Sequence, residues 1–242
     1  MISKISLNYS PNFSTKKRIK KNIKFIVFHY TGMSSQNKAI NRLTNVRSKV
    51  SCHYFIKKDG DIILMVPEIY SSWHAGISNW KKYKNLNNYS IGIEIQNNGH
   101  QFGYKKYNNN QINSIIKLSK FLIKKYKINK KNFLGHSDIA YLRKKDPGEK
   151  FPWSYLAKNG IGVWHNLNKK TLRKLRRAKI SNIDKNKFIF CLKKIGYFVK
   201  KVNLNQKIRL IKAFQMRFRP ELINGKIDKE CLIIANKLSK LS

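Results

Sequence analysis

The chain has 242 residues, which is enough for one domain of ordinary size and a smaller second one. Apolar residues make up 41% of the sequence, which permits a packed core and excludes wholesale disorder. The net charge of +41 favours anionic partners such as nucleic acids or cell-wall polymers. The basic residues are spread over the whole chain, and Lys, Asn and Ile are abundant together. A biased base composition therefore explains the charge more simply than a dedicated polyanion partner.

The cysteines and the N-terminal region narrow the cellular setting. Cys52, Cys191 and Cys231 are far apart and lack paired spacing, so we expect free, buried thiols and no disulfide framework or cysteine-ligated zinc. No stretch reaches the roughly 18 apolar residues of a membrane-spanning helix. Residues 1–22 form a basic lead-in without an export signal. We expect either a mature form that has lost its export signal or an intracellular protein.

The first third of the main domain predicts strands with one helix between them. An apolar run at 23–28, rich in β-branched and aromatic residues, is typical of a buried strand. Residues 36–48 are polar and predict a helix. Residues 52–56 and 61–66 predict two strands, and the Asp-Gly turn between them is typical of a β-hairpin.

The middle of the chain adds another strand and a long helix. Residues 90–95 predict a buried strand, and apolar residues at helical spacing predict a helix over 108–127. A short apolar segment then leads into a loop over 136–153, which contains Asp-Pro-Gly and Phe-Pro turn signals. Strands mixed with helices indicate an α/β (α+β) fold, with a mixed central sheet flanked by helices.

The remaining chain predicts a separate small unit. Residues 166–184 are dense in Lys and Arg and predict a connector that is helical in part. Helical periodicity returns over 185–242, where we expect a satellite domain of three short helices. The main domain accordingly spans 23–165.

Three residues could bind a metal ion. His29 ends the first predicted strand, His136 follows an apolar pair and a Gly, and Asp146 lies ten residues further on. A catalytic zinc site needs three nitrogen or oxygen ligands and one open position, which two His and one carboxylate can supply. Each signal is weak alone, because a His at a strand end is more often a hydrogen-bonded residue and an Asp before Pro-Gly is a common turn former.

Glu94 interrupts an apolar strand. A buried carboxylate there would have a raised pKa, as a general base or acid requires. Strand alternation could equally place Glu94 on a solvent-facing side together with Gly92 and Gln96. The pattern leaves these two alternatives even.

Two further groups have weaker chemical signals. Arg143 and Lys144 lie close to Asp146, where a cation could stabilise an oxyanion, although plain surface charge is the simpler reading in so basic a chain. Trp73, His74 and Trp80 form an aromatic and His cluster on a predicted loop. Such a cluster can line a cleft or simply pin the loop by a buried Trp.

Four blocks together resemble the zinc-dependent N-acetylmuramoyl-L-alanine amidases, a bacterial family related to peptidoglycan-recognition proteins and to T7-type lysozyme. The blocks occur in the family's order and extend over roughly residues 23–165. They are IVFHYT at 26–31; VSCHYFI at 50–56 with its Asp59-Gly60; WHAG at 73–76 with SIGIE at 90–94; and GHSDIA at 135–140 through DPG at 146–148 to FPW at 151–153. One block alone would be weak, but four in order with family-like spacing are specific.

The resemblance implies a role for each matching position. It implies that one Zn²⁺ is bound by His29, His136 and Asp146, that Glu94 activates a water molecule, and that Lys144 stabilises the transition state. It implies a substrate groove, with less certain individual roles, at His53, Trp73, His74 and Arg143. The reaction implied is hydrolysis of the amide bond between an N-acetylmuramoyl or anhydro-muramoyl residue and the L-alanine of the stem peptide in peptidoglycan.

The C-terminal segment also resembles a known unit, the three-helix peptidoglycan-binding domain. The resemblance rests on IGY at 195–197, AFQMRFRP at 213–220 and NGKID at 224–228. Amidases of this type with such a domain are anchored in the Gram-negative envelope, which implies an envelope or periplasmic location; a cytoplasmic location is the alternative. One departure concerns the metal loop, because Tyr141 occupies the position where the family commonly has Pro, which alters loop rigidity but removes no ligand.

Two other classes of function stay open on the sequence alone. A relative that had lost its activity would be a non-catalytic peptidoglycan-binding protein, although all three ligand positions and Glu94 are present here. A nucleic-acid-binding protein would agree with the charge, but the sequence has no recognisable nucleic-acid-binding motif. We expect a monomer with peptidoglycan or muropeptides as its partner and no specific nucleic acid.

Overall fold

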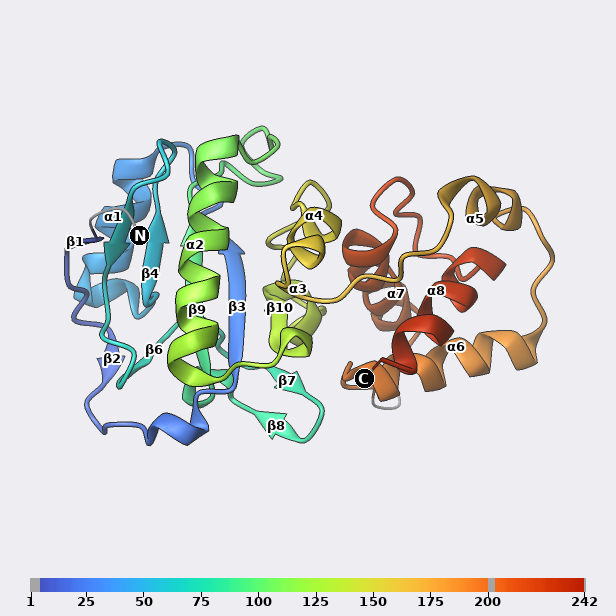
Figure 1. The fold of residues 1–242 in the computed structure, drawn as a ribbon, viewed down its shortest axis with the longest axis horizontal. Coiled ribbons are helices and arrows are strands. Elements are labelled where there is room, and N and C mark those ends of the chain that lie inside the picture. The colour runs from blue at the N-terminus through green and yellow to red at the C-terminus, as the bar shows by residue number, and fades with distance from the viewer. Residues whose placement is uncertain (1–4, 200–202, 242) are drawn as a thin grey trace.

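The computed structural model describes residues 5–199 and 203–241. A six-stranded sheet lies at one side of the molecule and a group of helices at the other (Figure 1). The strand order is β1-β5-β4-β9-β3-β10. The strands of this sheet are β1 (Ile5–Leu7), β3 (Phe25–Tyr30), β4 (Tyr54–Ile56), β5 (Ile62–Leu64), β9 (Ser90–Ile95) and β10 (Phe133–Gly135).

The sheet is mixed, as predicted. Strands β4, β9, β3 and β10 run parallel to one another, whereas β5 pairs antiparallel with β4 in the predicted hairpin. Two smaller two-stranded sheets join β2 (Phe13–Ser14) to β6 (Ser71–Ser72), and β7 (Asn79–Trp80) to β8 (Tyr83–Lys84). The carboxyl ends of parallel strands meet at one edge of a sheet, which is where α/β proteins commonly place their ligand sites.

Helices cover both faces of this sheet. The α-helices are α1 (Gln36–Thr44), α2 (Asn109–Tyr126), α3 (His136–Ile139), α4 (Trp153–Lys158), α5 (Lys169–Leu175), α6 (Asn182–Ile195), α7 (Leu204–Phe218) and α8 (Lys229–Ser239). Short 3₁₀ helices are η1 (Lys20–Asn22), η2 (Val46–Ser48), η3 (Leu86–Asn88) and η4 (Lys130–Asn132).

The long helix α2 has a side-chain cap at its first turn and a left-handed residue at its end. The side chain of Asn108 accepts the backbone N–H of Gln111, and the Gln111 side chain returns to the backbone of Asn108, so the first turn has a capping box. Lys127 ends the helix in a left-handed conformation. The predicted helix over 36–48 is shorter in the structure, because Asn45 adopts an extended conformation and ends α1 before the 3₁₀ turn η2.

The two faces of β3 pack against different parts of the chain. Ile26 and Phe28 belong to the apolar cluster that α2 covers, with Ile115 and Leu118. Phe25 and Val27, which point to the opposite face, belong to the cluster that includes the C-terminal helices. The metal-ligand candidate His29 continues this second face.

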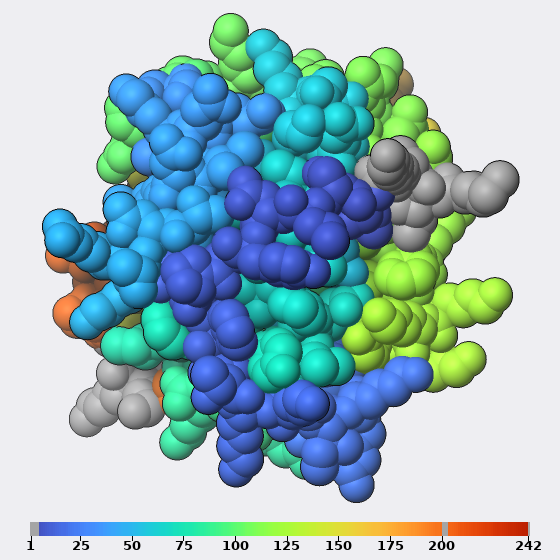
Figure 2. Space-filling view, turned by 90° about the vertical axis from the view of Figure 1, so that its left-hand side faces the viewer, coloured from blue at the N-terminus to red at the C-terminus, as the bar shows by residue number. Residues whose placement is uncertain are grey.

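The basic lead-in is part of the folded domain. It contributes β1, β2 and η1, and it crosses the surface on the side where β1 forms the sheet edge (Figure 2). The guanidinium of Arg18 donates to the backbone carbonyls of Glu68, Asn87 and Ser90, which ties this segment to the body of the domain.

The C-terminal region shares an apolar cluster with the sheet. The connector predicted over 166–184 contains α5, whose Leu172 is buried in the same cluster as the C-terminal helices. Helix α6 begins at Asn182, where Ser181 and Asp184 form a capping box. The same apolar cluster reaches Phe25 and Val27 of β3, so no seam separates this region from the sheet.

Two predictions about composition can also be compared with the structure. Cys52, Cys191 and Cys231 are buried free thiols, which confirms the expectation of unpaired cysteines. Within the described ranges, no helix combines the length and the apolar content that crossing a membrane requires.

Candidate metal centre and active site

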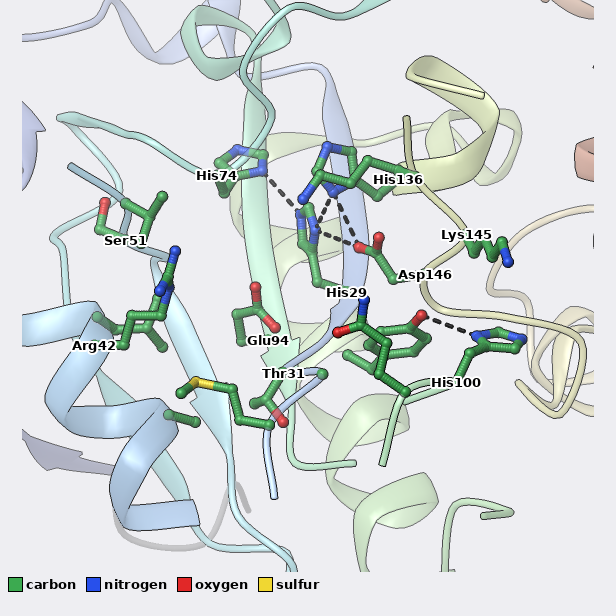
Figure 3. Close-up of a pocket in the computed structure, with 18 of the residues that line it drawn as sticks. His29, Thr31, Arg42, Ser51, His74, Glu94, His100, His136, Lys145 and Asp146 are labelled. Atoms are coloured by element: carbon green, nitrogen blue, oxygen red, sulfur yellow. Dashed lines mark hydrogen bonds and ion pairs between the residues drawn. The ribbon is translucent and has the colours of Figure 1, made fainter. Parts of the chain in front are cut away.

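The carboxyl ends of β3, β9 and β10 open onto a cavity of about 670 Å³. His29 lies near the end of β3, Glu94 lies opposite it on β9, and His136 directly follows β10. All three line the cavity together with Asp146 (Figure 3). The parallel pairing therefore brings together residues that are up to 117 positions apart in the sequence.

The three predicted ligands form a compact triangle. Nδ1 of His29 lies 2.9 Å from Nδ1 of His136, and each of these nitrogens lies 3.0 Å from Oδ2 of Asp146. All three residues are buried. Their ligand atoms lie close enough together to bind one metal ion.

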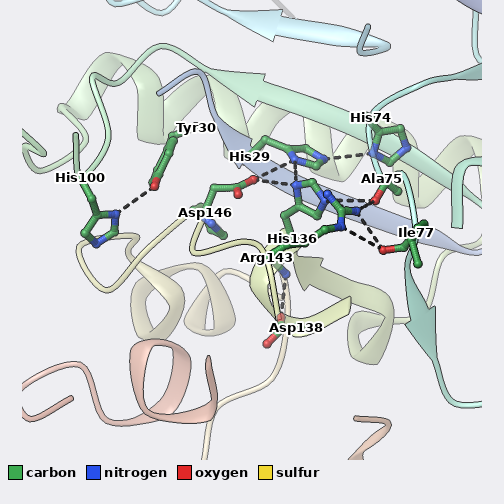
Figure 4. A network of polar contacts seen from close by, with 12 residues as sticks. His29, Tyr30, His74, Ala75, Ile77, His100, His136, Asp138, Arg143 and Asp146 are labelled. Carbon is green, nitrogen blue, oxygen red and sulfur yellow. Dashed lines mark hydrogen bonds and ion pairs between the residues drawn. The ribbon is translucent and has the colours of Figure 1, made fainter. Parts of the chain in front are cut away.

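The partner of His136 fixes which of its ring nitrogens carries the proton. Its Nε2 lies 3.1 Å from the backbone carbonyl of Ala75, which can only accept a hydrogen bond (Figure 4). Nε2–H is therefore the donor, and in the neutral ring Nδ1 keeps its lone pair. That lone pair points at the other two members of the triangle.

A longer chain of hydrogen bonds fixes the proton on His29 in the same way. The Ser90 hydroxyl donates to a carbonyl, that of Leu86, so its oxygen accepts from Nε2–H of His74 at 3.1 Å. Nδ1 of His74 then accepts from Nε2–H of His29 at 3.0 Å. Burial, reinforced by His136, lowers the pKa of His29 to about 4, so the ring is neutral at pH 7 and its Nδ1 is unprotonated.

Asp146 supplies a negative charge to this triangle. Burial acts to raise its pKa, but the contacts with His136 and His29 outweigh burial and hold the pKa well below the usual range. Two imidazole nitrogens and one carboxylate oxygen thus converge within 3.0 Å of one another. Nitrogen and oxygen donors of this kind are the ligands that a catalytic zinc ion uses, so the residues fit a metal ion.

Gly92 makes room for the His74 ring behind the ligand His29. A Cβ atom at residue 92 would lie 2.3 Å from Cγ of His74, which is far inside van der Waals contact. The Gly in the strand motif is therefore required by the imidazole packed over it. The motif at 90–94 supplies the Ser that holds His74, the Gly that admits it and the carboxylate that faces the cavity.

Glu94 faces the cavity and lacks a partner for one carboxylate oxygen. Its Oε2 is buried and accepts no hydrogen bond from the described residues. Burial raises the pKa of Glu94 well above its usual value; the charge of Asp146 adds to this effect and that of Lys144 opposes it. The sequence left the orientation of this side chain undecided, and the structure places it in the lining of the cavity.

The two predicted cations, Arg143 and Lys144, both line the cavity on the same loop as Asp146. The guanidinium of Arg143 donates to the backbone carbonyls of Ala75 and Ile77 (Figure 4). Arg143 thereby joins the loop that contains Asp146 to the loop that contains His74.

The predicted substrate-groove residues separate into two groups. Trp73 and His74 line the cavity, although His74 is 8% exposed and bonded to His29. His53 is a correction: it is fully buried and lies outside the cavity lining, because its ring accepts the backbone N–H of Gly92 and donates to the carbonyl of Tyr70. A His held this way stabilises the sheet and has no surface free for substrate.

Sequence reasoning assigned no role to Asp138, which lies on the same short helix as His136. This carboxylate is 1% exposed and forms an ion pair with Arg217. The one available signal was the scarcity of acidic residues, since the chain has only 11 and each one near a His deserved a role.

Comparison with known families gives an independent result. Residues 19–149 match the family described as N-acetylmuramoyl-L-alanine amidase. N-acetylmuramoyl-L-alanine amidase AmiD of Escherichia coli is 38% identical over 229 residues, which cover 89% of this chain and 82% of AmiD.

Solved structures agree with that result. AmiD in complex with anhydro-N-acetylmuramic acid-L-Ala-D-gamma-Glu-L-Lys superposes with a TM-score of 0.80 at 34% identity, covering 94% of this chain and 92% of the other. AmpDh3 of Pseudomonas aeruginosa, in complex with anhydromuramic pentapeptide, gives 0.80 at 32% identity, covering 96% of each chain. The amidase LysC of Clostridium intestinale gives 0.51 at 27% identity and covers only 66% of this chain but 99% of its own.

Proposed function

This chain belongs to the N-acetylmuramoyl-L-alanine amidase family, and from this premise we propose a zinc-dependent hydrolase of peptidoglycan. It cleaves the amide bond between the lactyl group of an N-acetylmuramoyl or anhydro-muramoyl residue and the L-alanine of the stem peptide. The two relatives solved with anhydro-muramic peptides, AmiD and AmpDh3, support this substrate class.

One observation carries the proposal: two buried imidazole nitrogens and one buried carboxylate oxygen converge beside the cavity. Nδ1 of His29, Nδ1 of His136 and Oδ2 of Asp146 all lie within 3.0 Å of one another. Two His and one carboxylate form a known ligand set for catalytic zinc, which leaves a position open. A bound zinc ion supplies Lewis acidity, which acidifies water and polarises a carbonyl oxygen.

The proton transfers are assigned to Glu94. Its raised pKa suits a group that takes a proton from the attacking water and gives it back later in the cycle. The proton returns to the nitrogen of L-alanine, so that water adds across the amide bond and yields a carboxylic acid and a free amine. Lys144 is assigned to the oxygen of the scissile carbonyl, where negative charge develops.

The cavity also has groups suited to the rest of the substrate. Trp73 offers an aromatic ring, and Arg42 and Lys145 lie on either side of the triangle and Glu94 (Figure 3). Stem peptides contain free carboxylates, which such cations attract. We assign Trp73 to the sugar or the peptide backbone and the two cations to these carboxylates.

The C-terminal helices and the location complete the proposal. Their resemblance to the peptidoglycan-binding domain supports a contact between residues 185–242 and the cell wall. The substrate class supports a location in the cell envelope.

The test is a product analysis of the purified chain. We expect mass spectrometry to find free stem peptides with an L-alanine amino terminus after incubation with sacculi or anhydro-muropeptides. A chelator should abolish their release, and added zinc should restore it. Binding to sacculi without release of amino termini would instead identify a non-catalytic wall-binding protein.

A further inference from the structure

The short helix that contains His136 is held from the C-terminal region. Asp138, two residues after His136, accepts the backbone N–H of Gly135 at 2.7 Å, which caps the first turn of α3. This same oxygen, Oδ2, also forms an ion pair with Arg217, whereas Oδ1 accepts a hydrogen bond from the hydroxyl of Tyr197 at 2.7 Å. All of these side chains are buried.

Arg217 also holds the strand that leads into this turn. Its guanidinium donates to the carbonyl of Phe133 in β10 at 2.8 Å and stacks on the ring of Trp153 at 4.2 Å. Because β10 ends at Gly135, one Arg of α7 contacts the strand before His136 and the acid after it. The direction of the His136 side chain therefore depends on a residue 81 positions away in the sequence.

Two more contacts hold the loop between His136 and Asp146. The hydroxyl of Tyr141 donates to the carbonyl of Phe198 at 2.9 Å, and Arg209 of α7 donates to the carbonyl of Leu142. Tyr141 occupies the position where a Pro would restrict the loop by itself. In this chain a hydrogen bond to the C-terminal region restrains the loop at that position.

These bonds are placed where a metal site needs rigidity. The segment 135–146 contributes His136, Lys144 and Asp146, and it is bonded on one side to the C-terminal region and on the other, through Arg143, to the loop at 75–77. LysC matches over 99% of its own length but covers only 66% of this chain, so that amidase has no counterpart of about a third of this chain.

We propose that the C-terminal helices are a positioning element of the metal centre, in which Tyr197 and Arg217 orient Asp138 and so fix the ligand His136. This inference rests on the proposed function, and it adds a second role to a region expected to contact only the wall. Residues that orient a metal ligand contribute strongly to metal affinity even though they never touch the ion.

The experiment compares two Tyr→Phe variants of the full chain. Tyr197→Phe removes the hydroxyl bonded to Asp138 and leaves the ring packed on Trp80. Tyr54→Phe is the matched control, because its hydroxyl donates to another buried carboxylate, Glu68, at 2.6 Å, away from the metal loop. The readouts are the rate of zinc loss to a chromogenic chelator, kcat and KM on an anhydro-muropeptide, and the thermal midpoint.

We expect Tyr197→Phe to lose zinc on the order of tenfold faster than the unmodified chain and to lower kcat with KM little changed. Tyr54→Phe should lower the thermal midpoint similarly but leave zinc loss and kcat unchanged. Equal zinc-loss rates in the two variants would overturn the inference and leave a purely structural contact.

A second variant tests the same inference in case Tyr197→Phe does not fold. Tyr141→Phe removes only the partly exposed hydroxyl bonded to Phe198, and we expect about threefold faster zinc loss, as for a weaker contact to the same loop. If Tyr197→Phe fails to fold and Tyr141→Phe loses zinc at the unmodified rate, the inference is also wrong. Failure of the proposed function is distinguishable, because the unmodified chain would then bind no zinc or release no amino termini.

Discussion

Two buried polar clusters in this molecule differ in how their charges are compensated. In the C-terminal region, Arg219 and Arg176 face Asp228 and Glu230. Each carboxylate oxygen of that cluster accepts a hydrogen bond, because Cys231 N–H takes the remaining Asp228 oxygen. In the cavity, Asp146 contacts His29 and His136 and forms no ion pair with an Arg or Lys of the described chain, and Oε2 of Glu94 has no partner among the described residues.

This difference in charge compensation helps to distinguish a cluster that stabilises the fold from one that binds a ligand. Charges that a protein compensates internally stabilise or specify the fold, since removing one partner leaves the other buried and unpaired. Charges left uncompensated are retained only where something else binds. In the Arg219 cluster Nε of Arg219 lacks a partner but each carboxylate faces a guanidinium, so by that criterion the cluster is structural and the His29 triangle is a candidate site.

The largest effect should come from removing a ligand from the triangle. In His136→Ala, we expect apparent zinc affinity to fall on the order of 10³-fold, which corresponds to about 4 kcal/mol, with loss of amidase activity. Metal analysis after dialysis against dilute chelator measures this. Retention of a full equivalent of zinc would exclude His136 as a ligand.

The next effect concerns Glu94, which should affect turnover but not metal binding. Glu94→Gln keeps the shape and removes the proton acceptor, so kcat should fall by about 10²–10⁴-fold while zinc stays bound. Burial raises the pKa of Glu94, which means that its ionised form opposes folding at pH 7, so the thermal midpoint should not decrease. A variant that kept more than a tenth of the activity on purified peptidoglycan would contradict this assignment.

The third prediction concerns the Arg219 cluster. A change there should lower the stability of the fold and leave zinc binding unchanged. Arg219→Met leaves Asp228 without its guanidinium partner, and we expect a loss of about 3–5 kcal/mol in the free energy of unfolding. Denaturant unfolding measures this loss. Zinc affinity, measured where the variant is fully folded, should equal that of the unmodified chain; a large drop would mean that the two clusters are not separable.

The smallest effect should come from the support behind His29. Gly92→Ala would displace the ring of His74, and we expect zinc affinity to fall by about 10–100-fold. The cause can be isolated with the double variant Gly92→Ala/His74→Ala. Because the ring is already gone there, the new Cβ should cost nothing further, so the two effects should not add. Full additivity would mean that the Cβ acts on something other than His74.

Local sequence pattern predicted the strands of the sheet and the positions of the candidate ligands at their ends. It did not predict which other segments pack around them. His29 and His136 follow apolar strand runs, so the ends of those strands could be located from local pattern alone. Glu94 stayed undecided, because alternation identifies a face of a strand but not what covers that face. The family resemblance supplied what local pattern lacked.

Contacts between distant segments are what the sequence could not show. His53 stands in one of the family-like blocks, yet its ring bonds Gly92 and Tyr70, which no local pattern reveals. In the region after residue 166, the dense charge concealed the buried residues Leu172 and Arg217. Arg217 and Asp138 are 79 residues apart, beyond the reach of any periodicity.

The pairing of β10 beside β3 also determines when the candidate metal site can form. Its two His are 107 residues apart, and they meet only after this long-range parallel pairing has formed. Such non-local contacts close late in folding, because loop-closure entropy opposes them until other contacts have formed. A chain still emerging from the ribosome, before residue 146 is made, has no complete metal site. Binding of the proposed zinc ion should therefore follow closure of the sheet.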